Sequence, residues 1–200
     1  MSKSLGNVTL VNDLLKDWDG EVIRLALLKA HYRSELNWSE DLLKESKAQL
    51  DRWYASLADF KKATNLTPNP EGYMTDEVIN NALYNNIFDD LSTPAAIVSL
   101  AGKSRDLRQA LAKTLSLVKG DARSMLVVAD LLGLLQKDPE DWFKGGASSD
   151  DQAEFDAIAL RRQEARAAKD WAAADAARDE AKAKGIVLED GPDGTTWRKA

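Results

Sequence analysis

The first seven residues of the chain could bind phosphate. They read MSKSLGN, so a lysine lies between two serines and a Gly-Asn pair follows. Lys3 offers a compact positive charge with three N–H donors, which suits phosphate oxygens. Ser2 and Ser4 add hydroxyl donors with little bulk, and Gly6 lets the backbone approach a ligand closely. These residues predict a loop that closes over a triphosphate. The alternative interpretation is an ordinary chain end that is held loosely.

The composition excludes several classes of protein. Of the 200 residues, 44% are hydrophobic and 30% are charged, which is ordinary for a globular chain with one core or two modest ones. The sequence has no cysteine and a single histidine, so disulfides, thiolate metal sites and histidine-rich metal sites are excluded. Since neither a long uncharged apolar run nor a signal-peptide pattern is present, we expect no membrane span and a cytoplasmic location.

The balance of charge bears on the partners. The chain has 33 acidic and 27 basic residues, which gives a net charge of −6. Indiscriminate nucleic-acid binding needs a strongly positive surface, so this class of protein is disfavoured. A local basic strip is compatible with the same balance.

Hydrophobic periodicity predicts a mostly α-helical chain. We expect two short helices in residues 8–32, the second capped by Asp19 with Glu21 in its first turn. A polar and aromatic connector follows, and Ser39 caps a long helix. His31, beside a tyrosine in this connector, is interpreted as a packing or hydrogen-bonding residue, because general acid–base catalysis needs partners within reach.

The middle of the chain predicts helices separated by turns rich in Gly, Pro, Asp and Thr. In chain order we expect a loop at 61–73, a helix capped by Thr75, a turn at 89–94 with Thr93 as cap, a helix over 95–118 ended by Gly120, a helix capped by Asp121, and a short turn with Trp142 and Phe143. The paired aspartates Asp89 and Asp90 are interpreted as turn residues, since no further metal ligands lie nearby in the sequence.

The remaining chain changes in composition. A Gly- and Ser-rich stretch around residues 144–150 predicts a linker, and Ser149 with Gln152 forms a capping box. An alanine-rich helical hairpin with Asp170 as its second cap comes next, then strands at 186–188 and 195–198 joined by a turn at 189–194. Trp197 fits a core role as well as a ligand contact.

The predicted fold is therefore mostly α, with a helical bundle and a small α+β end. We divide it into residues 1–38 (phosphate loop and connecting helices), 39–144 (bundle), 145–152 (linker) and 153–200 (small module).

Several stretches resemble the cysteinyl-tRNA synthetases, a family of class I aminoacyl-tRNA synthetases. The opening MSKSLGN resembles the KMSKSLGN loop of that class without its first lysine. HYRSELNWS resembles the segment after this loop in the cysteine-specific enzymes, and DDLSTP resembles their DDFNTP turn, with Leu91 and Ser92 as departures. KDWAAADAARD and GIVLEDGPDGTTW resemble their anticodon-binding end. The resemblance spans the whole chain and implies the C-terminal half of such an enzyme, beginning inside the loop.

This resemblance assigns roles to residues. It implies that Lys3 stabilises the phosphates of ATP during adenylate formation, within a loop that also contains Met1, Ser2 and Ser4. It implies anticodon contacts by four residues: Arg166, Trp171, Asp175 and Asp190. A tryptophan can stack on a base, a carboxylate suits the N1–H and amino group of guanine, and a guanidinium suits a base edge or phosphate.

The resemblance also implies cysteine, cysteine tRNA and ATP with Mg²⁺ as partners, and zinc in a catalytic domain. The HIGH element, amino-acid pocket and zinc ligands of the family are missing from this sequence. We therefore expect no complete catalytic site, no metal site, no aminoacylation by the isolated chain, and a monomer. The alternative function is a helical module that binds a protein partner on a synthetase-like scaffold, its C-terminal charges being ordinary solvated groups.

Overall fold

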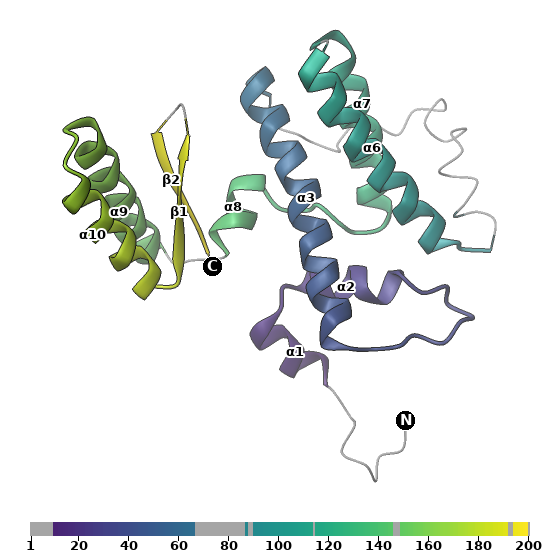
Figure 1. The fold of residues 1–200 in the computed structure, drawn as a ribbon. Coiled ribbons are helices and arrows are strands. Elements are labelled where there is room, and N and C mark those ends of the chain that lie inside the picture. The colour runs from purple at the N-terminus through teal and green to yellow at the C-terminus, as the bar shows by residue number, and fades with distance from the viewer. Residues whose placement is uncertain are drawn as a thin grey trace. The chain divides into compact units, whose positions relative to one another are not determined.

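The computed structural model describes residues 10–66, 87, 90–113, 115–145, 149–191 and 194–199. The loop with Lys3, the helix predicted after Thr75, Asp89 and the side chain of Ser149 lie outside this description. The chain divides into two compact units, Met1–Gln136 and Lys137–Ala200, and each is described by itself (Figure 1). The described residues are mostly helical and include an antiparallel pair of strands, so the predicted fold class is confirmed.

The first unit is built from helices. Those described are α1 (Val11–Asp17), α2 (Gly20–Leu28), α3 (Glu40–Thr64), α6 (Thr93–Lys113) and α7 (Leu115–Leu131). The predicted caps of α2 and α3 are confirmed. The carboxylate of Asp19 accepts from the N–H of Glu21 at 3.0 Å, and the hydroxyl of Ser39 accepts from the N–H of Leu42 at 3.2 Å.

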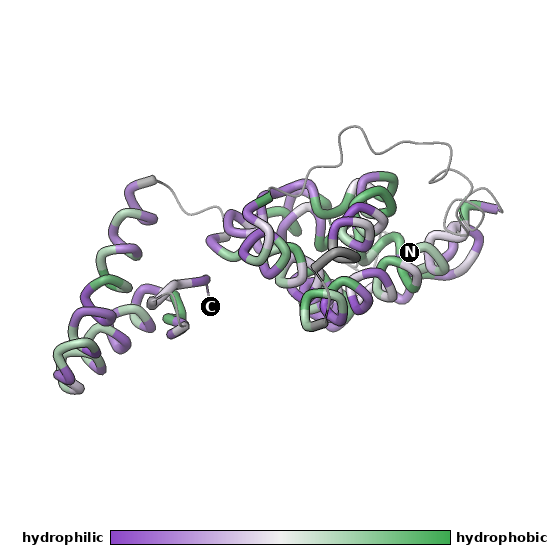
Figure 2. The backbone as a smooth tube through the Cα atoms, turned by 90° about the horizontal axis from the view of Figure 1, so that it is seen from above, coloured by the Kyte–Doolittle hydropathy of each residue, from purple (hydrophilic) through white to green (hydrophobic). Residues whose placement is uncertain are grey.

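The apolar faces of α2, α3, α6 and α7 form the core of the first unit. Figure 2 shows hydrophobic and hydrophilic residues alternating along these helices, as expected where each helix buries one face. The largest fully buried side chains of this unit are Val22, Leu25, Leu50, Tyr54, Leu57, Leu100, Leu107, Met125 and Leu134. In contrast, α1 buries none of its residues.

A buried carboxylate joins distant parts of the first unit. Glu21, in the first turn of α2, is 7% exposed. Its oxygens accept from the hydroxyl of Tyr54 on α3, at 2.9 and 3.0 Å. They also accept from the N–H of Leu135 at 2.8 Å and of Gln136 at 3.0 Å, just beyond α7. Burying a carboxylate is costly unless its oxygens are hydrogen-bonded, and here these donors satisfy them.

Two helix ends differ from the prediction. The loop predicted at 61–73 is wrong in its first four residues, because α3 continues to Thr64 and ends at Asn65 in the left-handed conformation. Thr93 is the first residue of α6, not its cap. The carbonyl of Ser92 accepts the first helical bond, from Ala96, and the hydroxyl of Thr93 donates instead to the carbonyl of Leu28 at 2.9 Å.

The break between α6 and α7 also differs. The helix predicted to reach residue 118 ends at Lys113, and α7 runs from Leu115 through Gly120 and Asp121, which were predicted as a stop and a cap. A glycine inside a helix costs about 1 kcal/mol relative to alanine. Burial of the following turns of α7, including Met125 and Val128, outweighs that local preference.

The second unit combines helices with a hairpin. Its elements are α8 (Pro139–Lys144), α9 (Ser149–Ala167), α10 (Trp171–Ala183), β1 (Ile186–Gly191) and β2 (Gly194–Lys199). The short turn predicted around Trp142 is a helix, α8, capped by Asp138. The predicted cap of α10 is confirmed, since Asp170 accepts from the N–H of Ala173 at 3.0 Å. Helix α9 begins at Ser149, inside the segment that the sequence analysis assigned to a linker.

The hairpin is longer than predicted. Residues 189–191 and 194, predicted as a turn, continue the ladder, in which Leu188 pairs with Trp197 and Asp190 with Thr195. Gly194 has a φ of +126°, and a Cβ there would lie 2.6 Å from the side-chain oxygen of Gln163 on α9. The side chain of Gln163 could move aside, but a φ of +126° is a conformation that residues with a Cβ rarely adopt, so glycine is favoured here.

The hairpin covers α9 and α10 through a small core: Phe155, Ile158, Ala159, Ala177, Ala181, Ile186 and Trp197. Trp197 is 6% exposed, packs edge-on against Phe155 with ring centroids 4.9 Å apart, and donates its indole N–H to Asp156 at 2.6 Å. Of the two interpretations of this tryptophan, the structure therefore supports the core role.

Replacing Glu21 by alanine should destabilise the first unit by about 3 kcal/mol or more, because it removes a buried carboxylate that accepts hydrogen bonds from the hydroxyl of Tyr54 and from the N–H groups of Leu135 and Gln136. Amide hydrogen exchange within α3 of the full chain measures this effect in the first unit alone. Glu45→Ala is the matched control. Glu45 lies on α3, the helix whose exchange is measured, and its side chain is 72% exposed. Equal exchange rates in the two variants would contradict the prediction.

Candidate nucleic-acid interface

The carboxylate of Asp190, near the end of β1, is the centre of a charged network. One oxygen accepts from Nε of Arg162 at 3.2 Å and from the hydroxyl of Thr195 at 2.9 Å. The other accepts from Nη2 of Arg162 at 2.8 Å and from Nη1 of Arg166 at 2.5 Å. The two arginines lie four residues apart and hence on one face of α9. These four contacts match the acceptor capacity of a carboxylate.

The network determines the charge state of Asp190. Hydrogen bonding by Arg162 lowers the pKa of this carboxyl far below its usual range, with further lowering by Arg166 and Thr195, while partial burial acts in the opposite direction. The same bond raises the pKa of Arg162, and the charge of Asp175 adds to that effect. Both partners therefore stay ionised at any physiological pH.

Arg162 joins three elements of the second unit. Its side chain is 13% exposed, and besides its two bonds to Asp190 on β1 it donates from Nη1 to the backbone carbonyl of Ala174 on α10 at 2.9 Å. The sequence analysis did not single out this arginine. Its position four residues before Arg166 on a predicted helix indicates that the two arginines share a face. Its partner, Asp190, lies 28 residues away, so the sequence did not predict their contact.

The four predicted anticodon residues differ in their surroundings. The structure brings Arg166 and Asp190 into direct contact. Trp171, in the first turn of α10, is 62% exposed. Asp175 lies one turn further along α10, is exposed, and is close enough to Arg162 to influence its pKa. The predicted phosphate-loop residues, Lys3 with Met1, Ser2 and Ser4, lie outside the described residues.

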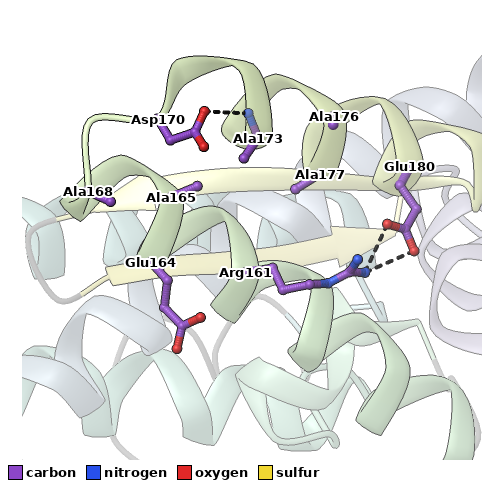
Figure 3. Close-up of a pocket in the computed structure, with 9 residues that line it drawn as sticks. All are labelled: Arg161, Glu164, Ala165, Ala168, Asp170, Ala173, Ala176, Ala177 and Glu180. Carbon is purple, nitrogen blue, oxygen red and sulfur yellow. Dashed lines mark hydrogen bonds and ion pairs between the residues drawn. The ribbon is translucent and has the colours of Figure 1, made fainter.

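A shallow groove of about 510 Å³ runs between α9 and α10 (Figure 3). Most of the residues that line it are alanines: Ala165, Ala168, Ala173, Ala176 and Ala177. Arg161 spans it with two bonds to Glu180, at 2.9 and 3.0 Å. Arg161 and Arg162 are adjacent in sequence, yet their carboxylate partners lie on different elements, Glu180 on α10 and Asp190 on β1, because successive helical residues point about 100° apart.

The requirements of a metal site and of a membrane-spanning helix also bear on the described residues. No cluster of three or more His, Asp or Glu side chains there could hold a metal ion. Within the same residues, none of the helices is long and apolar enough to cross a membrane.

Two family models match this chain. The class I tRNA synthetase (C) catalytic domain matches residues 1–48, and the cysteinyl-tRNA ligase anticodon binding domain matches residues 150–198, which contain α9, α10 and the hairpin. The whole chain is 43% identical to a cysteine–tRNA ligase of Aliivibrio fischeri, and 42% identical to one of Shewanella putrefaciens and to cysteine–tRNA ligase 1 of Photobacterium profundum.

Over its whole length, the chain is therefore similar to part of the cysteine–tRNA ligases. It spans 42% of the length of each of these three relatives, and its residues 150–198 match the anticodon binding domain of cysteinyl-tRNA ligases. The resemblance predicted from the sequence is thereby confirmed. The charged network of Asp190 lies entirely within the part of the chain that matches the family's anticodon-binding domain.

Asp190→Asn should destabilise the second unit by about 1–3 kcal/mol at pH 7, because two arginines lose a charged acceptor. A carboxyl with a lowered pKa stabilises the fold above its unfolded pKa, near 3.8, and this stabilisation is lost as the pH falls below that value. The difference between wild type and variant should therefore shrink between pH 7 and pH 2.5.

Urea unfolding of the full chain, followed by the indole N–H resonance of Trp197, measures this in the second unit. Asp179→Asn, at an exposed position of α10, serves as the control with little expected effect. A difference that is constant with pH would contradict the assigned role of Asp190.

Proposed function

We propose that this chain is the tRNA-binding part of a cysteine–tRNA ligase, and that its second unit contacts the anticodon of cysteine tRNA. The observation that carries the proposal is that the residues matching the family's anticodon-binding domain combine an exposed tryptophan with a fixed, charged network. In the complete enzyme, cysteine and ATP give an adenylate, and the cysteinyl group then passes to the tRNA.

The four anticodon residues have complementary roles in this proposal. Trp171 offers a flat, exposed face on which an unstacked base can stack. Asp175 and Asp190 supply acceptors for the N–H groups of a base edge, and Arg166 supplies donors for a base edge or a phosphate. Since the two carboxylates are held near Arg162, their negative charge is partly neutralised, which lowers their repulsion of the RNA backbone.

The rest of the reaction belongs to the complete enzyme. We assign Lys3, in the loop with Met1, Ser2 and Ser4, to the phosphates of ATP, with Mg²⁺ as their counter-ion. Zinc belongs to the catalytic domain, and no residue of this chain is assigned to it. The enzyme acts in the cytoplasm as a monomer, and the isolated chain does not aminoacylate tRNA, because the residues that bind cysteine and the HIGH element are not in this sequence.

Trp171→Ala should weaken binding of cysteine tRNA by about 1–3 kcal/mol, since one stacking contact is lost. Asp175→Ala should also weaken binding. Fluorescence anisotropy with labelled tRNA measures both, and affinity should fall as salt rises from 50 to about 200 mM. Leu160→Ala is the control, because Leu160 is 53% exposed on α9 and has no assigned contact.

The matched RNA for this experiment is the same tRNA with a changed anticodon. Equal binding of the two RNAs by the wild-type chain would refute anticodon reading. If the chain instead captures no tRNA at all, the alternative of a protein-binding module gains support.

A single-turnover assay with ATP, cysteine and cysteine tRNA should give no cysteinyl-tRNA with the isolated chain. The longer enzyme from a relative provides the positive control. Product formation by the 200-residue chain would overturn the assignment of the chemistry to a separate catalytic domain.

A further inference from the structure

The anticodon acceptor Asp190 is fully occupied in the free chain. Its two oxygens receive four donors: two from Arg162 and one each from Arg166 and Thr195. A carboxylate has about four acceptor positions, so a base edge cannot bind Asp190 until one donor leaves. The question is therefore which donor leaves Asp190 when a base binds, and which donors keep the carboxylate in place.

The two arginines are not equivalent as donors. Arg162 is 13% exposed, grips both oxygens of Asp190 with a planar fork, and is anchored a third time by the carbonyl of Ala174. Arg166 is 41% exposed and, among the described residues, contacts Asp190 through one nitrogen. Moving Arg166 breaks one contact, whereas moving Arg162, the less exposed of the two side chains, breaks three.

We infer that Arg162 is the positioning residue of the anticodon site, and that Arg166 is the donor that exchanges from Asp190 to the RNA. This inference rests on the proposed function. When Arg166 swings away, one position of Asp190 is freed for a base N–H group, and the released guanidinium can bind a base edge or phosphate. Asp190 remains paired with Arg162 throughout, so no uncompensated charge is left.

The third bond of Arg162 extends this role to α10. Ala174 precedes Asp175 and lies within one turn of Trp171, so its carbonyl fixes the part of α10 that presents both side chains. Arg162 thus sets the distance between the acceptor on β1 and the contact face on α10. Disturbing it should reduce discrimination between anticodons, whereas a residue that only stabilises the fold would not alter discrimination once the unit is folded.

Arg162→Lys tests this role, because lysine keeps the charge but cannot reproduce the fork together with the third bond. The full chain is titrated with cysteine tRNA and with the same tRNA carrying one changed anticodon base, and the ratio of the two dissociation constants is compared. Arg161→Lys is the matched control: Arg161 is the neighbouring arginine on α9 and pairs with Glu180 through two bonds of similar length. The indole resonance of Trp197 reports whether the second unit is folded.

We expect the ratio to fall about tenfold or more in folded Arg162→Lys and to stay within about twofold of wild type in Arg161→Lys. An unchanged ratio in Arg162→Lys, with a wild type that discriminates, would overturn the inference and leave the proposed function intact. A wild type that does not discriminate would overturn the proposed function itself.

A second variant decides the matter if Arg162→Lys does not fold. Thr195→Val removes one donor to Asp190 while both arginines remain, and it should lower the ratio by about threefold, the loss expected from one weakened hydrogen bond. A ratio equal to that of the wild type would then count against a positioned carboxylate at this site.

Discussion

The ion pair between Arg162 and Asp190 is the interaction on which the second unit most depends. A two-stranded hairpin is at best marginally stable alone, and alanine-rich helices bury little apolar area per residue. The core that joins the hairpin to α9 and α10 is correspondingly small, with Phe155 and Trp197 as its aromatic members. The bidentate ion pair between Arg162 and Asp190 adds a directional constraint that this core lacks, because it ties one position of β1 to one position of α9.

The first unit uses a carboxylate in the same way. Glu21 is more deeply buried than Asp190, and its partners are neutral donors rather than arginines. It satisfies the backbone N–H groups of Leu135 and Gln136 where the chain leaves α7, so an irregular segment can be buried against α2 and α3. In each unit, an acidic side chain is thus a structural acceptor for groups far away in the sequence, although both residues could be taken for ordinary surface charges.

The candidate interface combines fixed and adaptable parts. Arg162 and the carbonyl of Ala174 hold Asp190 and α10 together, while Trp171, Asp175 and Arg166 remain accessible. Recognition of single-stranded bases needs both properties, since a base must be stacked by an exposed ring and then tested by groups that do not move. The acidic chain therefore needs no large positive surface, because a few arginines that are placed next to carboxylates provide local charge where it is required.

The sequence by itself determined the helical character of the chain, three of the helix caps, the hairpin and the resemblance to the cysteinyl-tRNA ligases. Asp19, Ser39 and Asp170 could be assigned as caps because capping depends on residues within one turn. The same local rules misplaced the helix break near Gly120, where burial of later turns overrides a local preference. Arg166, Trp171, Asp175 and Asp190 could be named from motifs, but not the contact between Arg166 and Asp190.

Only the tertiary structure decided which charged groups meet. The burial of Glu21, the core role of Trp197 and the position of Arg162 depend on partners 28 or more residues away. Hydrophobic periodicity specifies which face of a helix is buried, but not which residue of another element lies opposite a given side chain. That pairing follows from the packing of whole elements. It explains why Arg161 forms an ion pair with Glu180 across the groove, while the neighbouring Arg162 binds Asp190 in the candidate site.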